Sequence, residues 1–323
     1  MTATVQTTSA TNSMMALRAH MRGGPEVLVY EEAPRPVPGP GEVLVEVHAA
    51  AITFAELDWA ETWTRDGADR TPIVPSHEVS GVVVARGEGT TEFDIGTEVF
   101  GLVRFDRDGA AADYVAVRAA DLALKPASVP HPVAAALPLA ALTAWQALHD
   151  HAHLRPGDRV LIHGGAGGVG AFAVQLAHGA GVQVTATALA QDAELVRRLG
   201  AAEVIDFQRV AFDAQGAVFD VVLDTIGGTT LERSFNVLKP GGRLITLQAP
   251  PSQERAKQLG ISATFFIVTP DRDGLNRIAR IAATDRLEVL IAGQYPLAHG
   301  RAAYESSRDP ERKPGKTVLV VRP

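Results

Sequence analysis

The hydrophobic positions along the chain divide it into two regimes. From residue 16 to about residue 125, short β-prone segments are separated by turns rich in Pro and Gly, of which residues 34–41 (PRPVPGPG) are the clearest. The expected strands here are residues 27–30, 42–49, 79–85, 98–103 and 113–117. This pattern predicts a twisted antiparallel or barrel-like domain.

The pattern changes near residue 130. Apolar residues first recur at helical spacing over residues 133–148, which predicts one long helix, and strands then alternate with helices. The expected strands are residues 159–163, 183–187, 203–206, 220–226, 243–247 and 264–268, and the expected helices are residues 169–180, 192–199, 229–238 and 252–259. Near-continuous apolar strands such as Val221-Val222-Leu223 suit a parallel sheet covered on both faces. We therefore expect an α/β, doubly wound, six-stranded parallel sheet.

Two further elements follow this alternating region. A helix is expected over residues 272–283, and a last strand over residues 317–321. Because the six-stranded sheet has no place for that strand, we expect it to return to the first domain.

A glycine-rich turn lies between the first strand of the second regime and the helix that follows it. Residues 163–170 read HGGAGGVG, in which Gly165, Gly167 and Gly170 satisfy G-x-G-x-x-G. Glycines permit the tight turn and leave room for a pyrophosphate, while the free N–H groups of the helix N-terminus attract that anion. In this strand–turn–helix context the motif predicts a dinucleotide site.

Composition narrows the class of protein. With 323 residues the chain can form two domains, and 46% hydrophobic and 21% charged residues are ordinary for a globular protein. A net charge of −7 argues against a nucleic-acid partner, and no apolar run is long enough to span a membrane. The absence of Cys excludes disulfides, thiol catalysis and Cys-ligated zinc. The first 15 residues, polar and rich in Thr and Ser, are expected to be a disordered tail rather than a signal peptide, so a cytoplasmic location is expected.

Several short motifs occur in a fixed order along the chain. They are residues 38–45 (PGPGEVLV), 77–81 (HEVSG), 139–144 (LAALTA), 154–164 (LRPGDRVLIHG), 199–201 (LGA), 224–228 (DTIGG) and 238–242 (LKPGG). This ordered set resembles the medium-chain dehydrogenase/reductase superfamily, and within it the zinc-independent quinone oxidoreductase (zeta-crystallin-like) branch. The resemblance implies a GroES-like catalytic domain over residues 16–130 and 270–323, a Rossmann NADP-binding domain over residues 131–269, and an active-site cleft between them.

The resemblance also bears on metal binding. His77-Glu78 is similar to the Gly-His-Glu of the alcohol dehydrogenases, whose His ligates catalytic zinc, but Ser76 stands in place of the glycine. Aligning Thr143 with the family threonine puts Leu139 where a third ligand would lie. A catalytic zinc needs about three protein ligands, so we expect no zinc. The run His149-x-His151-x-His153 is interpreted as solvated histidines.

The expected cofactor is NADPH. An NAD site calls for an Asp or Glu at the end of the second strand, yet residues 186–190 (ATALA) contain no acid. The Lys and Tyr that hold the 2′-phosphate in this branch correspond to Asp192 and Phe207, so NADH remains an alternative, and Arg197, Arg198 or Arg209 could compensate. The residues expected to contact the cofactor are Gly165, Ala166, Gly167, Gly168, Val169, Thr187, Ala188, Phe207, Thr225, Ile226, Leu247 and Ala249.

Without a metal, the expected acceptors are quinones or α,β-unsaturated carbonyls, since hydrogen-bond donors can stabilise the oxygen anion that forms on them. By the resemblance, Thr143 lies near the nicotinamide, and Thr53 and Asp58 replace the pocket Asn and Tyr of the branch. Thr53 can donate a hydrogen bond, and Asp58 is either a proton relay or a surface carboxylate. The catalytic candidates are therefore Thr53, Asp58 and Thr143.

Two other functions remain open. A non-catalytic, crystallin-like protein that binds NADPH would also explain the lost pocket residues. An S-adenosylmethionine methyltransferase would explain residues 237–244 (VLKPGGRL) but not the β-rich first domain. Finally, residues 263–268 (ATFFIV) form an apolar sheet edge that invites pairing, and relatives join such edges, so a homodimer is expected.

Overall fold

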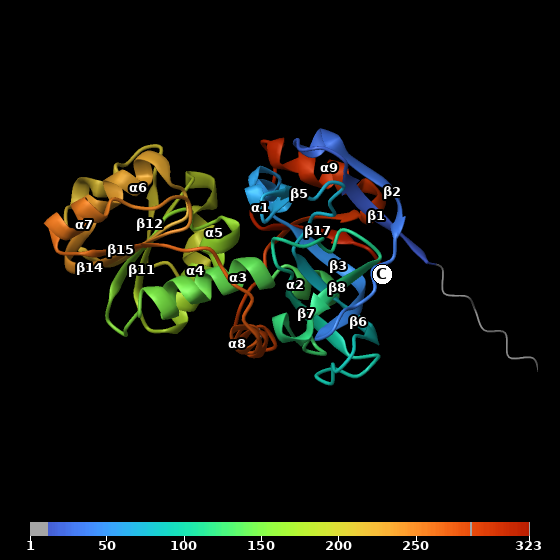
Figure 1. Ribbon diagram of the computed structural model, residues 1–323. Coiled ribbons are helices and arrows are strands. Elements are labelled where there is room, and N and C mark those ends of the chain that lie inside the picture. Colours follow the sequence, from blue (N-terminus) through green and yellow to red (C-terminus); the bar gives the residue numbers. More distant parts are fainter. Residues whose placement is uncertain (1–11, 285, 323) are drawn as a thin grey trace, which may run out of the picture.

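The chain folds into two lobes, each built around one large β-sheet (Figure 1). The computed structural model describes residues 12–284 and 286–322. The prediction of a disordered tail over residues 1–15 falls mostly outside them. Its last residues are ordered, because β1 (Ser13–Ala19) pairs antiparallel with β2 (Leu28–Pro34).

The first lobe contains a seven-stranded sheet in the order β16-β17-β3-β6-β7-β9, with β8 paired to β3. Its strands are β3 (Glu42–Ile52), β6 (Glu78–Arg86), β7 (Glu98–Leu102), β8 (Tyr114–Arg118), β9 (Leu122–Leu124), β16 (Ile291–Pro296) and β17 (Lys316–Val320). The small ribbon β4 (Thr64–Arg65) and β5 (Ala68–Asp69), and the helices α1 (Ala60–Trp63) and α9 (Gly300–Glu305), lie beside it. The last strand, β17, runs antiparallel to β3, so the expectation that it returns to the first sheet is confirmed.

The second lobe contains the expected six-stranded parallel sheet, in the order β12-β11-β10-β13-β14-β15. Its strands are β10 (Arg159–Ile162), β11 (Gln183–Ala188), β12 (Glu203–Asp206), β13 (Phe219–Asp224), β14 (Leu238–Thr246) and β15 (Ser262–Phe265). Its helices are α4 (Gly168–Gly179), α5 (Ala193–Arg198), α6 (Gly228–Ser234) and α7 (Gln253–Leu259). The order turns at β10, the first strand of this lobe in the sequence. This is the arrangement of a doubly wound dinucleotide fold.

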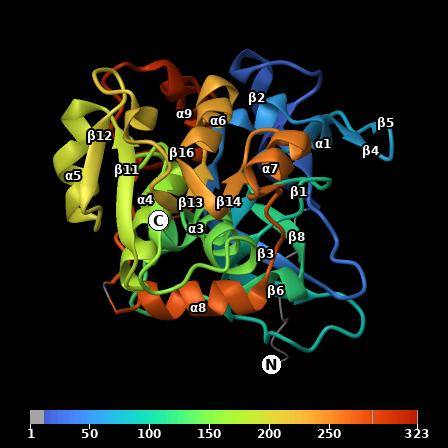
Figure 2. The same cartoon turned by 90° about the vertical axis from the view of Figure 1, so that its left-hand side faces the viewer.

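Both faces of this sheet are buried, as its apolar strands predict. Val160 and Ile162 of β10 pack into the cluster that contains α4, whereas Leu161 between them packs into the cluster that contains α6 and α7. Alternate side chains of one strand thus belong to two different cores. Figure 2 looks onto this lobe, with α8 (Arg272–Ala282) across its lower side.

The prediction of a single helix over residues 133–148 is wrong. The segment forms α2 (His131–Ala135), then α3 (Pro138–Trp145), then a π-helix (Gln146–His151). Pro138 has no N–H to continue the hydrogen bonding of α2, so it can only start a new helix. α3 packs against α4 and α8, and its residues share one hydrophobic cluster with Phe100 and Leu102 of β7. The core is therefore continuous between the lobes.

The remaining short helices are 3-10 turns. They are η1 (Pro25–Val27), η2 (Phe54–Asp58), η3 (Ala119–Asp121), η5 (Ala190–Asp192), η6 (Phe212–Gln215), η7 (Phe235–Val237), η8 (Leu297–His299) and η9 (Ser306–Arg308). In the described part of the chain, no helix has the length and apolarity needed to cross a membrane.

Candidate functional site

The glycine-rich turn joins β10 to the N-terminus of α4, as predicted. Gly167 caps α4, and the turn is anchored to the neighbouring strand β11 through Thr187. The Gly165 N–H donates to the Thr187 carbonyl at 2.8 Å, and the Gly164 N–H donates to Thr187 Oγ1 at 3.1 Å. The first N–H groups of α4 have no acceptor within the helix, so they are available to bind an anion.

A buried carboxylate organises the loops beside this turn. Asp224, at the end of β13, accepts hydrogen bonds from the Ile226 and Gly227 N–H groups at 3.1 and 3.0 Å. It also accepts one from Thr246 Oγ1, at the end of β14, at 2.9 Å. The loops that follow β13 and β14 are thereby held together at the carboxyl edge of the sheet, where open α/β folds bind ligands.

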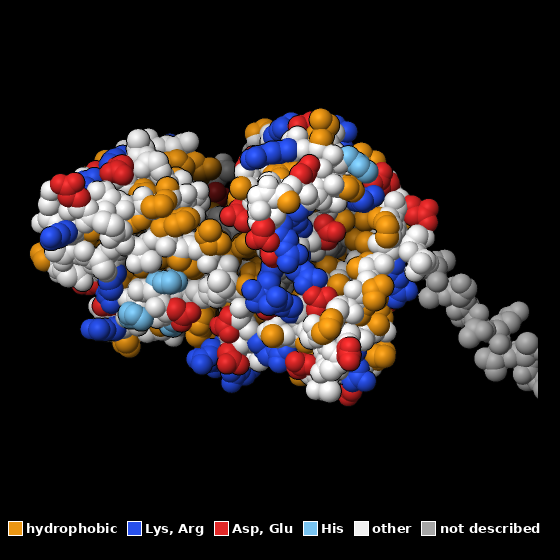
Figure 3. Space-filling view, viewed as in Figure 1, with side chains coloured by type: hydrophobic (Ala, Val, Ile, Leu, Met, Phe, Trp, Pro, Cys, Tyr) orange, Lys and Arg blue, Asp and Glu red, His pale blue; other side chains and the backbone are white. Residues whose placement is uncertain are grey.

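The two lobes meet in a cleft of about 350 Å³. Figure 3 shows the surface hollowed between them. The lining residues come from both sheets, α3 and the nucleotide turn: Ile52, Thr53, Phe54, Leu139, Ala140, Gly164, Gly167, Gly168, Val169, Thr225, Ile226, Leu247, Gln248, Arg312, Gly315, Lys316 and Thr317. Among these described residues the only charged side chains are the cations Arg312 and Lys316. The cleft therefore favours an anionic ligand.

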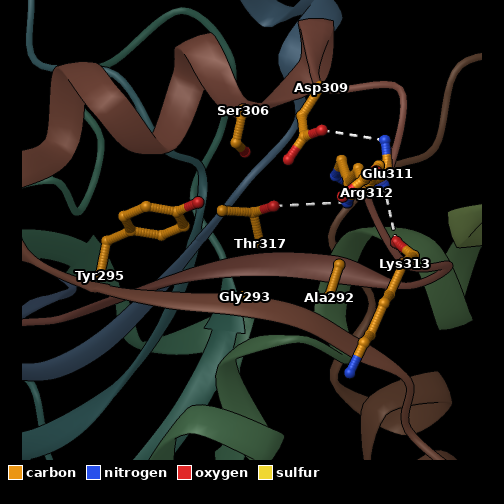
Figure 4. A pocket seen from close by; sticks show the side chains of 9 residues that line it. All are labelled: Ala292, Gly293, Tyr295, Ser306, Asp309, Glu311, Arg312, Lys313 and Thr317. Carbon is orange, nitrogen blue, oxygen red and sulfur yellow. Dashed lines mark hydrogen bonds between the residues drawn. The ribbon is translucent and has the colours of Figure 1, made fainter.

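Arg312 reaches the cleft from the loop before β17. Its guanidinium lies 4.9 Å from the Phe54 ring centroid. It donates to Thr317 Oγ1 at 3.3 Å, a bond drawn in Figure 4, and to the backbone carbonyls of Lys313, at 3.3 Å, and Gly315. Burial lowers the pKa of this guanidinium. Within the described residues it has no carboxylate partner, and its buried Nε has no hydrogen-bond partner. A half-buried guanidinium whose charge is not neutralised by a carboxylate is suited to attract a phosphate or carboxylate.

Lys316, at the start of β17, is held from two sides. Its ammonium forms an ion pair with the buried carboxylate of Glu78 on β6 and donates to Thr53 Oγ1 at 3.2 Å. Glu78 Oε1 in turn accepts the Leu139 N–H of α3 at 2.9 Å. Burial raises the pKa of Glu78, and Lys316 opposes that rise. These contacts tie α3 to the first sheet at the cleft wall.

A second buried carboxyl lies behind Thr53. Glu56 accepts hydrogen bonds from the Tyr304 hydroxyl, from the Ser76 N–H at 3.0 Å and from the Thr53 N–H at 3.3 Å. Burial raises the pKa of Glu56 to about 7, although these hydrogen bonds oppose the rise. His77 Nε2 lies 3.8 Å from Glu56 Oε2, and burial lowers the pKa of His77 to about 3. At neutral pH this imidazole is uncharged.

The structure brings many of the sequence-predicted residues to the cleft. Seven of them line it: Thr53, Gly167, Gly168, Val169, Thr225, Ile226 and Leu247. Gly165, Ala166, Thr187 and Ala188 lie behind this lining, where Thr187 supports the turn. Thr143 also lies behind it, because it is buried one turn below Leu139 and donates its hydroxyl to the Leu139 carbonyl at 2.6 Å.

Three predicted residues are not brought to the cleft wall. Asp58 is exposed at the end of η2, so the burial that a proton relay with a raised pKa would require is absent. Phe207 is 53% exposed on the loop after β12, and Ala249 is exposed beyond the cleft-lining Gln248.

The sequence analysis missed the charged groups of the site: Glu56, Glu78, Arg312 and Lys316. Lys316 lies 238 positions after Glu78 and 263 after Thr53, so no local motif announces either contact. The one signal was Glu78 itself, an acidic residue at the start of a strand that is otherwise largely apolar.

A dinucleotide-type turn that faces a cationic cleft between two lobes defines an oxidoreductase architecture, and comparison with known proteins agrees. Residues 39–127 match the alcohol dehydrogenase GroES-like domain family, and residues 199–319 match the zinc-binding dehydrogenase family. The chain is 32% identical over 308 residues to the "Probable zinc-binding oxidoreductase, mitochondrial" of Arthroderma benhamiae, covering 89% of this chain and 92% of that protein. It is 35% identical over 233 residues to the "NAD(P)H oxidoreductase RTN4IP1, mitochondrial" of Mus musculus, covering 65% of this chain and 59% of that one.

Solved structures show the same similarity. The quinone oxidoreductase from Coxiella burnetii superposes with a TM-score of 0.88 at 29% identity, covering 96% of this chain and all of that one. A mycobacterial quinone oxidoreductase gives a TM-score of 0.82 at 28% identity, covering 95% and 99%. The chain belongs to the medium-chain dehydrogenase/reductase superfamily, in its quinone oxidoreductase-like branch. Members of this superfamily are oxidoreductases that bind NAD(P).

The names of these relatives raise the question of zinc, and the donor set of this chain does not fit it. Both ring nitrogens of the buried His77 lack hydrogen-bond partners. Among the described residues, the only carboxyl group that forms an ion-pair contact with His77 is that of Glu56, at 3.8 Å. Leu139, at the position of a third ligand, has no donor side chain, and the chain has no Cys. No group of three metal-ligating side chains occurs within residues 12–284 and 286–322. These residues do not provide the three protein ligands that a catalytic zinc needs.

Proposed function

We propose that this protein is a zinc-independent, NADPH-dependent reductase that transfers hydride to a quinone or an α,β-unsaturated carbonyl compound. The observation that carries the proposal is the cleft, where the N-terminus of α4 converges with Arg312, which has no carboxylate partner in the described residues, and with Lys316, which pairs with the buried Glu78 behind the lining. A pyrophosphate fits such a site, because helix N–H groups and cationic side chains both stabilise it.

Three groups of this chain would hold the cofactor. The turn before α4 offers its N–H groups, and Arg312 offers a positive charge with no carboxylate partner in the described residues, although its guanidinium already donates to the Lys313 and Gly315 carbonyls. The stem of Lys316 lies against the turn, with Cδ 3.7 Å from the position of a Cβ on Gly168. Bound cofactor would supply the hydride. The protein's contribution would then be to orient the two reactants and to exclude water. Leu139, Ala140 and Leu247 form apolar parts of the cleft wall that suit this role.

A preference for NADPH over NADH is supported by the end of β11. Thr187 and Ala188 are both buried there, and residues 186–190 contain no acid to hold a ribose 2′-hydroxyl; the next acid, Asp192, ends η5. Two arginines on neighbouring elements carry side chains that reach solvent. Arg209 is bound only to Asp206, at 3.5 Å across one turn, so it is free to rearrange toward a 2′-phosphate, whereas Arg198 pairs with Glu288.

The proposed acceptors follow from the chemistry of a site without zinc. Quinones and conjugated carbonyls take hydride at carbon or oxygen and leave a delocalised oxygen anion, which cations and hydrogen-bond donors can stabilise. Oxidation of a saturated alcohol would need a strong base or a Lewis acid at the reacting oxygen. The two cations of the cleft suit the first reaction and not the second.

Titration of the purified protein with NADPH and NADH, followed by nicotinamide fluorescence and thermal shift, tests the cofactor. We expect NADPH to bind at least tenfold more tightly. NADPH oxidation is then measured with 1,4-naphthoquinones and 2-cyclohexen-1-one. Binding without oxidation of NADPH by any of these acceptors would favour the non-catalytic alternative, and binding of neither nucleotide would overturn the proposal.

We also propose a homodimer in which the β15 edges of two copies pair. β15 is the terminal strand of its sheet, and the segment after it exposes Ile267 by 57%. An apolar edge with unpaired backbone groups is a template for a second copy of itself.

A further inference from the structure

Thr53 presents its hydroxyl to the cleft at the end of β3. The residue is half-buried and lines the cleft together with Leu139 and Gly168. Its backbone N–H is fixed by the carboxyl of Glu56, so the side chain is held at the cleft wall by a rigid loop. In the described part of the chain, no protein group accepts the proton of this hydroxyl.

Lys316 determines which way that proton points. An ammonium group can only donate, so Thr53 Oγ1 must accept the 3.2 Å hydrogen bond from Lys316 Nζ. The hydroxyl proton is then directed away from Lys316. A hydroxyl that already accepts a bond from a cation is a stronger donor, since the two bonds polarise one another.

The ammonium is itself held in place. Lys316 is 7% exposed, and its charge is balanced by the fully buried carboxylate of Glu78. The charge of Lys316 also acts to lower the pKa of Glu56, on η2. The other cation that lines the cleft is Arg312. Glu78 is fixed in turn by the Leu139 N–H. The chain Glu78–Lys316–Thr53 therefore runs from the protein interior to the cleft surface, where it ends in an unused donor.

We infer that Thr53 is the proton donor to the substrate oxygen, and that Lys316 is the positioning residue that supplies the proton through it. This inference rests on the proposed function. As hydride adds, its electron pair forms the new C–H bond and the π electrons of the acceptor shift to the acceptor oxygen. The Thr53 O–H bond then breaks, and a new O–H bond forms on the product. A proton from Lys316 restores the threonine, and water later returns a proton to Lys316. The net reaction consumes one hydride and one proton.

The first test uses variants that preserve the fold. Thr53→Val keeps the shape of the side chain and removes its donor. Lys316→Met is combined with Glu78→Gln, because Lys316→Met alone would leave a buried carboxylate unpaired. Thr53→Ser should retain activity. Lys313→Met is the matched control, since Lys313 is an exposed lysine of the same loop that does not line the cleft.

Two quinones of similar shape separate proton donation from a structural role. The hydroquinone of 2,3-dichloro-1,4-naphthoquinone is more acidic than that of 2,3-dimethyl-1,4-naphthoquinone, so its anion needs less help from a proton donor. The chain has no Cys with which the chlorinated compound could react. We expect Thr53→Val and the double variant to lower kcat about 100-fold with the dimethyl compound and only a few-fold with the dichloro compound. An equal loss with both quinones, or no loss, would overturn the inference.

A second readout needs neither turnover nor cofactor. 4-Nitrophenol changes its visible absorbance on ionisation, so its pKa can be measured when it is bound to the protein. We expect the wild-type protein to lower that pKa and Thr53→Val to restore it by about one unit, a tenfold change in the ionisation constant. An unchanged bound pKa in Thr53→Val would overturn the role of Thr53. If the wild type reduced no acceptor, the proposed function would fail, and this measurement would still decide whether Thr53 stabilises an oxygen anion.

Discussion

Gly170 in the first turn of α4 packs directly against the backbone carbonyl of Gly164, so closely that a Cβ on Gly170 would lie 2.1 Å from that oxygen. Gly170→Ala must therefore displace the nucleotide turn. We expect a loss of about 3 kcal/mol in the free energy of unfolding, together with at least tenfold weaker NADPH binding. Chemical denaturation and fluorescence titration measure the two effects.

The control is Gly179→Ala in the same helix. Nothing lies within 4 Å of the position of its Cβ, so we expect that variant to be neutral or slightly stabilised. Wild-type stability and affinity in Gly170→Ala would show that the turn is not as closely packed as the structure indicates.

Arg312 offers a test of the cleft's charge. Because its guanidinium has no carboxylate partner in the described residues, Arg312→Met should remove a cation without exposing a buried acid. We expect NADPH affinity to fall about tenfold or more, as for one charge-assisted hydrogen bond, and the dependence of Kd on salt to become weaker. Titrations at several salt concentrations measure both. Lys313→Met should change neither quantity; equal effects of the two variants would mean that only general charge is involved.

Ser76 stores backbone strain beside the site. Its φ is +74°, a conformation that L-residues rarely adopt, and its hydroxyl donates to the Ala51 carbonyl at 2.9 Å. Ser76→Ala loses the bond and keeps the strain, whereas Ser76→Gly loses both. We therefore expect Ser76→Gly to be more stable than Ser76→Ala by about 1 kcal/mol in urea denaturation. If Ser76→Ala were the more stable of the two variants, the positive φ at this residue would not cost measurable free energy.

Glu56 and His77 give opposite pH dependences of stability. The raised pKa of Glu56, about 7 against 4.5, means that its contribution is fully present below pH 4.5 and is lost as the pH rises to 7. The lowered pKa of His77, about 3 against 6.5, gives a contribution that is present above pH 6.5 and lost as the pH falls. Over the shared interval the two largely cancel.

Glu56→Gln should remove the opposing contribution of Glu56 and leave the pH dependence that His77 contributes to stability. We expect the free energy of unfolding of the variant, relative to wild type, to rise by about 3 kcal/mol between pH 4.5 and pH 7, whatever the constant cost of the substitution. Denaturation at a series of pH values measures this difference. A flat difference for Glu56→Gln would mean that Glu56 ionises normally in the folded protein.

The proposed dimer can be tested at the sheet edge. Ile267→Asp places a charge on the exposed segment that follows β15, and we expect it to convert a dimer into a monomer in sedimentation at micromolar concentration without changing the thermal unfolding of the lobe much. Wild-type protein that sediments as a monomer would refute the dimer outright.

Local sequence patterns determined most of the second lobe. Apolar strands such as β10 must be covered on both faces, and the glycines of residues 164–170 permit one tight turn into α4, so the parallel sheet and the nucleotide turn followed from short segments. The same reasoning placed Thr225 and Leu247 at strand ends, the family resemblance pointed to Thr53, and the structure brings all three to the cleft. It failed at Pro138, because the prediction followed the apolar periodicity, whereas the missing N–H of this proline separates α2 from α3 in the structure.

The sequence by itself thus determined the strands of the second lobe, the turn and the family, because each depends on neighbouring residues and on steric rules that act over a few positions. Only the tertiary structure decided the charges of the site. Lys316 meets Glu78 and Thr53 because β17 returns to pair with β3, and Arg312 enters the cleft from the loop before that strand. An ion pair is strong once folding has buried it in a low-dielectric interior, and the separation of two charges in the sequence does not reveal whether folding will bring them together.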